Sequence, residues 1–157
     1  MEKNFNERYM EAKKRIALIA HDHKKYELVE WALHHKKILN NHELFATGTT
    51  GALVEEALSQ PIQKFQSGPL GGDQQIGSLI VEGKIDILIF FWDPMAALPH
   101  DPDIKALLRI GAVWNIGIAC DSTTADYIIS SPFMNQPYNR SMPDYESYKN
   151  RNIEKGT

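Results

Sequence analysis

Cysteine is almost absent from this sequence: among 157 residues there is one, Cys120. A single thiol cannot form a disulfide within the chain, which excludes a small disulfide-stabilised scaffold and is typical of proteins from a reducing compartment. The N-terminal segment MEKNFNERYMEAKKR also lacks the apolar stretch of a secretory signal peptide. We therefore expect a cytoplasmic protein.

Long apolar runs and a surplus of positive charge are missing as well. No run approaches the ~18 residues that a membrane-spanning helix needs, and the formal net charge is −3. We therefore expect no membrane partner, and there is no general electrostatic reason for the chain to bind nucleic acid. Local basic sites for a small anion remain open. Internal repeats and low-complexity segments are also lacking.

The chain does contain enough apolar residues for one hydrophobic core. Hydrophobic residues make up 43% and charged residues 24%, close to the averages for globular proteins. The length corresponds to about one domain. We expect a single domain over residues 1–157, with a core at about 15–132 and a polar C-terminal surface tail over 133–157. One short helix is expected in that tail, near Tyr145.

Short apolar runs alternate with amphipathic segments along the core. The run Ile16–Ala20 and the run Ile85–Phe91, which is apolar apart from Asp86, are typical of strands that are buried on both faces. Weaker strands are expected at Glu43–Ala46, Ile62–Gln66 and Ile116–Ala119, and helices at Leu28–Leu33, Ala52–Leu58, Ile76–Val81, Ile104–Ile110 and Thr124–Ile129. This alternation predicts an α/β fold with a doubly wound, Rossmann-like, five-stranded and mostly parallel sheet that has helices on both faces.

Polar segments follow all five expected strands. In an open parallel sheet, ligands bind beyond the carboxyl ends of the strands. The segments at these positions are HDHKK (21–25), TGTTG (47–51), SGPLGGD (67–73), WDP (92–94) with PHDPD (99–103), and DSTT (121–124). Their concentration at one sheet edge is the main indication of function.

The segment TGTTG leads into an expected helix. Its glycines let backbone amides approach a ligand, and a helix N-terminus favours negative charge. The hydroxyls of Thr47, Thr49 and Thr50 add further donors. The segment is therefore either a phosphate cradle or a set of capping residues that opens a helix.

Two other segments also allow more than one interpretation. Asp73 follows a cluster of glycines that favours close approach of the backbone to a neighbour. It either caps the next helix or takes part in a reactive site with His21, Asp93 and His100. On an extended segment, His21 and His23 would point the same way, which suits a metal ion. A solvated loop, or a histidine bonded to a carboxylate, explains the pair equally well.

Five motifs in this order resemble the methylglyoxal synthase family: AHDHKK, ATGTTG, SGPLGGDQQIG, IFFWDP and PHDPDIKALLR. Each motif is weak alone, but five in order over about residues 16–132 are highly specific. The resemblance implies a lyase that converts dihydroxyacetone phosphate into methylglyoxal and inorganic phosphate through an enediolate. It also implies that no metal or organic cofactor is needed, and that the protein is a homohexamer inhibited cooperatively by inorganic phosphate.

The resemblance also implies roles for individual residues. Asp73 matches the base that removes a proton from carbon, and His21 matches the histidine that donates or shuttles a proton at the substrate oxygens. Supporting acids, a further contact to the substrate oxygens and a group that orients the histidines correspond to Asp22, Asp93, His100 and Asp103. The matching substrate and phosphate contacts are His21, Lys25, Thr47, Gly48, Thr49, Thr50, Ser67, Gly68 and His100.

The C-terminal segment departs from the family pattern. YNRSMP (138–143) is more polar than the apolar strand that precedes Pro-Asp-Tyr in the family. Asn152 stands where the family has an arginine that contacts a neighbouring subunit, and Arg151 lies one position earlier. These differences concern contacts between subunits and leave the expected active site intact.

Two other functions are compatible with parts of the sequence. A non-catalytic domain that senses a phosphorylated ligand would keep TGTTG and the Ser67–Gly68 pair, but it would have no use for Asp73 together with His21 and Asp93. A metal-dependent hydrolase would use His21, His23 and Asp93, and its activity would be lost to chelators.

Overall fold

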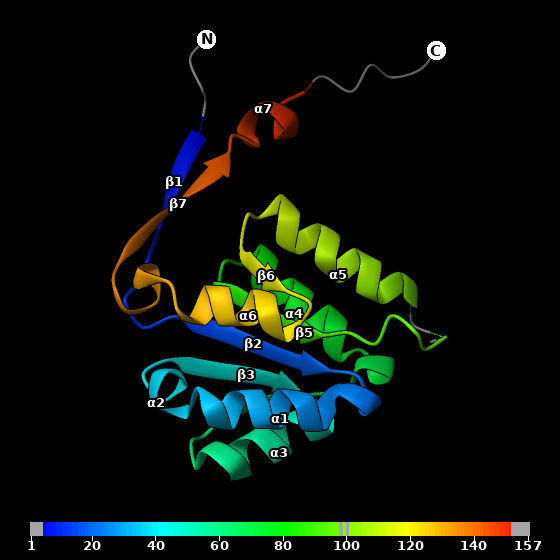
Figure 1. The fold of residues 1–157 in the computed structure, drawn as a ribbon. Coiled ribbons are helices and arrows are strands. Elements are labelled where there is room, and N and C mark those ends of the chain that lie inside the picture. The colour runs from blue at the N-terminus through cyan, green and yellow to red at the C-terminus, as the bar shows by residue number, and fades with distance from the viewer. Residues whose placement is uncertain (1–4, 98, 100, 152–157) are drawn as a thin grey trace.

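A parallel sheet of five strands forms the centre of the molecule (Figure 1). The computed structural model describes residues 5–97, 99 and 101–151. The strands of this sheet are β2 (Arg15–Ala20), β3 (Glu43–Thr47), β4 (Gln63–Phe65), β5 (Ile87–Phe91) and β6 (Gly117–Ala119). They lie in the order β4-β3-β2-β5-β6, and every neighbouring pair is parallel. The expected five-stranded parallel sheet is confirmed.

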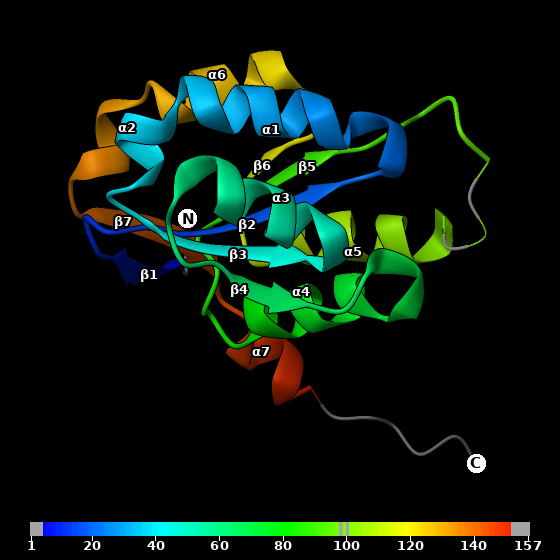
Figure 2. The same ribbon diagram turned by 90° about the horizontal axis from the view of Figure 1, so that it is seen from below.

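Helices cover both faces of the sheet, as expected (Figure 2). They are α1 (Lys25–His34), α2 (Lys36–Leu39), α3 (Gly48–Leu58), α4 (Gly72–Val81), α5 (Asp101–Val113) and α6 (Ser122–Ile129). Buried side chains of α1, α2, α3 and α6 pack with Ile16 and Leu18 on one face. Those of α4 and α5 pack with Ala17 and Ile19 on the other. Because β2 is buried on both faces, its sequence is a continuous apolar run.

The two helices that follow from the TGTTG and SGPLGGD motifs, α3 and α4, begin earlier than expected. Helix α3 begins at Gly48 rather than Ala52, and α4 at Gly72 rather than Ile76. Their first turns consist of glycine and polar residues, so the apolar periodicity that predicts a helix starts only in the second turn. Both motifs therefore lie on helix N-termini rather than in loops before them.

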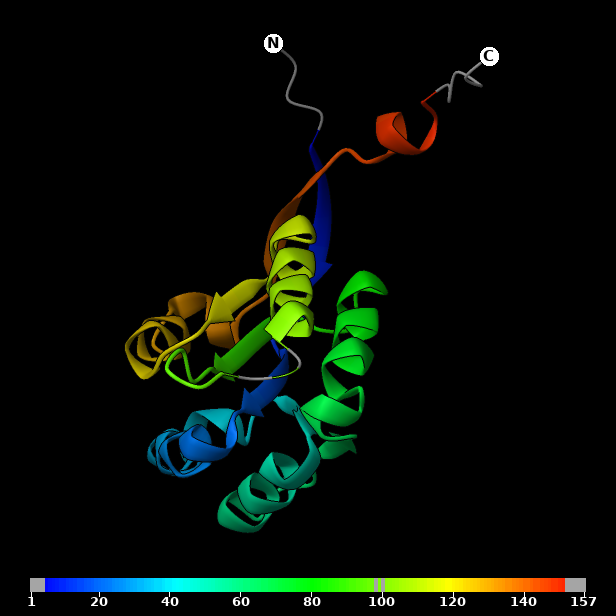
Figure 3. The same cartoon turned by 90° about the vertical axis from the view of Figure 1, so that its right-hand side faces the viewer.

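The two ends of the described chain form a structure that the sequence pattern did not predict. β1 (Phe5–Met10) and β7 (Tyr138–Pro143) pair as an antiparallel ribbon that extends away from the parallel sheet (Figures 1 and 3). The expected surface tail is therefore wrong for β7. In this strand Arg140 and Met142 are buried, and the polar arginine conceals the alternation of a half-buried strand. The short helix expected near Tyr145 is confirmed as α7 (Glu146–Lys149).

The length and composition of the described helices decide whether one of them could cross a membrane. None of the helices in the described ranges combines the length and the apolar character needed to cross a membrane.

Candidate active site

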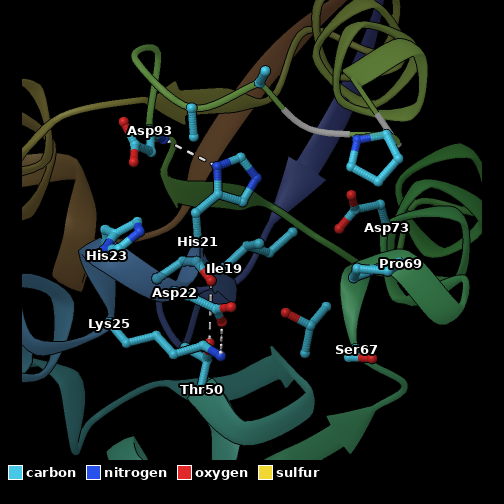
Figure 4. A pocket seen from close by; sticks show the side chains of 16 residues that line it. Ile19, His21, Asp22, His23, Lys25, Thr50, Ser67, Pro69, Asp73 and Asp93 are labelled. Atoms are coloured by element: carbon cyan, nitrogen blue, oxygen red, sulfur yellow. Dashed lines mark hydrogen bonds and ion pairs between the residues drawn. The ribbon is translucent and has the colours of Figure 1, made fainter.

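The strand order locates a crevice at the carboxyl ends of β2 and β5. The chain adds β3 and β4 on one side of β2 and then places β5 and β6 on the other. Doubly wound sheets bind ligands at such a switch point. A cavity of about 360 Å³ opens here (Figure 4). The lining residues that the sequence predicted for the site are His21, Asp22, Lys25, Thr47, Thr50, Ser67, Gly68, Asp73 and Asp93.

His21 directly follows β2, and the segment after β5 orients its ring. The backbone N–H of Asp93 donates to His21 Nδ1 at 3.0 Å, and the ring packs edge-on against Phe90 with centroids 5.2 Å apart. Since Nδ1 accepts a hydrogen bond, the proton of the neutral ring is assigned to Nε2. His21 is therefore oriented as a neutral imidazole that can donate from Nε2.

Lys25 joins the segment after β2 to the TGTTG segment. Its Nζ donates to Asp22 Oδ1 and to Thr49 Oγ1, both at 2.6 Å. Thr49 lies in the first turn of α3, where backbone N–H groups lack partners within the helix. A lysine charge at this helix start suits a phosphate group.

Asp22 is hydrogen-bonded to Lys25, which makes it a poor candidate for the base. Its side chain is 89% exposed. The hydrogen bond from Lys25, together with the charge of that lysine, holds the pKa of Asp22 below its ordinary value. A carboxylate with a lowered pKa is a weak proton acceptor. The geometry assigns Asp22 to the positioning of Lys25.

Asp73 lies in the first turn of α4 and is buried, with 2% of its surface exposed. In Figure 4 its carboxylate points into the same cavity as the His21 ring. The N-cap of α4 is Gly71, so the interpretation of Asp73 as the helix cap is wrong. A general base must lie within reach of the proton that it removes, and a carboxylate in the cavity wall meets this condition.

Two glycines, Gly48 and Gly72, allow the TGTTG and SGPLGGD segments to lie close together. Gly48 has a φ of +44°, and a Cβ there would lie 2.9 Å from the Cα of Ser67. A Cβ on Gly72 would lie 2.0 Å from the carbonyl oxygen of Gln66 and 3.0 Å from Thr47 Cγ2. These contacts fix the start of α4, and with it Asp73, against the segments that carry Ser67 and Thr47.

We expect Gly72→Ala to destabilise the protein and Gly77→Ala to be neutral or stabilising. The first substitution forces backbone apart and should lower the free energy of unfolding by about 3 kcal/mol. Gly77 lies in the same helix, and its Cβ would meet only Leu107 Cδ1 at 3.8 Å. Alanine there improves helix propensity by up to ~1 kcal/mol. Denaturant unfolding of both variants measures the difference, and equal midpoints would contradict the close approach at Gly72.

The remaining described residues that the resemblance singled out do not line the main cavity. Thr49 contacts Lys25, and Gly48 contacts Ser67, although neither residue lines the cavity. Asp103 lines a separate cavity between α4 and α5, which it shares with Asp73. His100 and Asn152 lie outside the described residues. Arg151 stacks on the ring of Tyr148, with its guanidinium carbon 3.7 Å from the ring centre.

The polar segments after β6 and β2 both lead into helices. The segment after β6 does not line the main cavity, and its Asp121 caps α6 by accepting from the Thr124 N–H at 2.8 Å. Residues 22–24 form a short 3-10 helix rather than an extended segment, so the premise that aligned His21 with His23 is wrong. Within residues 5–97, 99 and 101–151, no group of three His, Cys, Asp or Glu residues is placed to hold a metal ion.

Several lining residues were not among the predicted residues of the lyase site: Ile19, Ala20, His23, Pro69, Ala96, Ala97 and Pro99. Of these, His23 was considered only as a metal ligand. Ile19 and Ala20 end an apolar strand, and only their place at its carboxyl end indicates a site. Residues 96 and 97 lie between two motifs and are small and apolar. They form one wall of the cavity, which no polar pattern could have indicated.

Comparisons with known proteins show what this chain is similar to. A family model described as an MGS-like domain matches residues 27–120. The methylglyoxal synthase of Pseudoalteromonas atlantica is 59% identical to this chain over 133 residues. That of Coxiella burnetii (strain RSA 493 / Nine Mile phase I) is 55% identical to it over 140 residues. These alignments cover 84% and 89% of this chain, respectively, and 98% of each relative.

The fold has a close counterpart among solved structures. The crystal structure of methylglyoxal synthase from Elizabethkingia anophelis NUHP1 superposes with a TM-score of 0.90 at 54% identity. The match covers 96% of this chain and 99% of that one. Identity at this level over nearly the whole chain, together with the shared fold, shows that the chain belongs to the methylglyoxal synthase family.

Proposed function

We propose that this chain is a lyase that converts dihydroxyacetone phosphate into methylglyoxal and inorganic phosphate. One observation carries the proposal. A single cavity combines a buried carboxylate, Asp73, with an imidazole oriented by a backbone N–H, His21, and a lysine beside a helix N-terminus, Lys25. These are the three groups that the reaction needs: a base, a donor for the enediolate oxygen and a site for the phosphate.

The first step is removal of a proton from the hydroxymethyl carbon next to the ketone. Asp73 takes this proton. The electron pair of the broken C–H bond forms a carbon–carbon double bond, and the π pair of the ketone moves onto the carbonyl oxygen. A positioned carboxylate is a suitable general base for this transfer. The close approach of the backbone at Gly72 supports the assignment, because it holds Asp73 in one place against the cavity.

The enediolate oxygen formed in this step needs a donor. A neutral imidazole can donate a hydrogen bond to such an oxygen, as it does in triosephosphate isomerase, an enzyme with another fold. The hydrogen bond from the Asp93 N–H to His21 Nδ1 supports this role, because it leaves the proton on Nε2. Asp93 thus contributes its backbone to the orientation of His21.

Elimination of phosphate completes the reaction. The C=C electron pair of the enediolate shifts toward the phosphate-bearing carbon as the C–O bond to the phosphate breaks, and the electron pair of that bond leaves with the phosphate. The hydroxyl on the deprotonated carbon loses its proton and becomes the aldehyde, and the enol takes up one proton at its methylene carbon to give methylglyoxal. The proton held by Asp73 passes to the departing phosphate, which restores the base. Lys25 and the first turn of α3 can bind the leaving phosphate, since charge and backbone N–H groups meet there. Thr47, Thr50, Ser67 and Gly68 line the same cavity.

A direct assay tests the proposed function. Pure protein treated with a chelator is incubated with dihydroxyacetone phosphate, and methylglyoxal and inorganic phosphate are followed together. We expect release of both products in equal amounts. Binding of the substrate without release of either product would contradict the lyase and favour a non-catalytic sensing domain. Activity that depends on added metal would favour a hydrolase.

Further expectations from the resemblance complete the proposal. We propose a homohexamer that is cooperatively inhibited by inorganic phosphate, acts in the cytoplasm, and folds as one domain with no organic cofactor. The location of Lys25 beside the first turn of α3 supports phosphate as an inhibitor, because the product would occupy the place of the substrate phosphate. The single cysteine supports the reducing compartment.

A further inference from the structure

A second cavity lies at the opposite edge of the sheet from the proposed active site. It has a volume of about 290 Å³ and lies where β2, β5 and β6 begin, beside the β1–β7 ribbon. The polar residues that line it are Lys14, Asp86, Asn115, Ser131, Tyr138 and Arg140. The residues assigned to the proposed reaction do not contribute to it.

Arg140 is the unusual residue of this cavity. It lies on β7 and is buried, with 3% of its surface exposed. Its Nε and Nη1 are shielded from solvent, and they have no hydrogen-bond partner among the described residues. A guanidinium withdrawn from water without a partner is costly by several kcal/mol. A polar partner for Arg140 is therefore expected.

The nearby carboxylate does not fill this role. Asp86 is bound by Arg15, which donates to it from Nη2 at 2.8 Å, from Nε at 3.1 Å and from its backbone N–H at 2.9 Å. Salt bridges between described residues pair Asp86 with Arg15 and do not include Arg140. Asp86 is therefore hydrogen-bonded to Arg15 and forms no salt bridge with Arg140.

Other cations increase the positive charge around Arg140. Lys14 is buried, and its Nζ donates to the carbonyl oxygen of Gln136 at 2.7 Å, which brings no negative charge. Arg8 lies directly opposite Arg140 in the ribbon, and like charges in that position destabilise a strand pair. Burial, with repulsion from Arg8 and Arg15, holds the pKa of Arg140 below its ordinary value, although Asp86 acts in the opposite direction.

We propose that this cavity binds a doubly charged oxyanion of the phosphate class through the guanidinium of Arg140. Guanidinium N–H groups form strong charge-assisted hydrogen bonds with phosphate oxygens. Two cations of the cavity wall, Lys14 and Arg140, form no salt bridge among the described residues, whereas Asp86 in the same wall is paired with Arg15, so the wall favours an anion. The site is separate from the substrate cavity, and the inference does not depend on the proposed activity.

Equilibrium dialysis against radiolabelled inorganic phosphate tests the proposal. We expect the Arg140→Met variant to bind one phosphate fewer per chain than the wild type, whatever number the active site contributes. The control is Lys105→Met, which removes a positive charge from the exposed surface of α5. Lys105 lines neither the substrate cavity nor the second cavity, so the control should bind as many phosphates as the wild type. Equal binding by wild type and Arg140→Met would overturn the proposal.

Two further measurements cover the cases in which the variant does not fold or changes its oligomeric state. If Arg140→Met does not fold, wild-type crystals soaked in selenate replace it. An anomalous peak within hydrogen-bond distance of Arg140 is expected, and a cavity without a peak would overturn the proposal.

Light scattering should give the same mass for wild type and Arg140→Met. A change in mass, with equal phosphate binding by both proteins, would assign the cavity to a carboxylate from a second copy of the chain instead.

Discussion

Asp73→Asn is expected to reduce kcat by about 10²–10⁴-fold, the usual contribution of a general base. Asparagine keeps the size of the side chain but cannot accept a proton from carbon at neutral pH. The proposed phosphate contacts come from Lys25 and the start of α3, so the variant should still bind a phosphorylated substrate analogue. Steady-state kinetics and titration with the analogue measure the two effects separately.

Asp22→Asn is the matched comparison for this variant. Asp22 is exposed and anchors Lys25 through a hydrogen bond of 2.6 Å. Loss of its charge should loosen Lys25 and raise KM more than it lowers kcat. A large loss of kcat in Asp22→Asn, with near-normal kcat in Asp73→Asn, would exchange the roles of the two carboxylates.

His21→Ala is expected to reduce kcat by about 10²–10³-fold, as removal of one donor from an oxyanion site does. The enediolate exists only after proton removal, so a donor to its oxygen stabilises the transition state more than the bound substrate. Affinity should therefore change less than rate. Kinetic constants for the variant, with binding of the substrate analogue measured independently, check this expectation.

His34→Ala serves as the control for a histidine substitution. His34 is exposed on α1 and does not line the substrate cavity. Its removal should leave both kinetic constants near those of the wild type. If His21→Ala loses affinity but keeps a normal rate at saturation, His21 would be a binding residue and another group would have to serve the enediolate oxygen.

The parallel sheet could be predicted because its strands are local features of the sequence. Ile16–Ala20 and Ile87–Phe91 are short apolar runs buried on both faces, and such runs mark strands wherever the rest of the chain goes. The β1–β7 ribbon could not be predicted in this way. Its two strands lie at opposite ends of the chain, and one of them places an arginine on its buried face.

The candidate site shows the same division between local and distant features. The segments TGTTG and SGPLGGD indicated close backbone approach, and the contacts at Gly48 and Gly72 agree with that expectation. The sequence could not separate a base from a helix cap at Asp73. That distinction depends on where α4 begins, and its first turn carries no apolar periodicity.

By itself, the sequence determined the α/β class, the positions of the strands and the set of motifs at one sheet edge, because composition and apolar periodicity act over a few residues. Only the tertiary structure decided which atoms meet. It joined the Asp93 N–H to His21 Nδ1, placed Lys25 between Asp22 and Thr49, and buried Nε and Nη1 of Arg140 without a partner among the described residues. These contacts connect distant segments, and their geometry arises only when the sheet and its helices pack around one core.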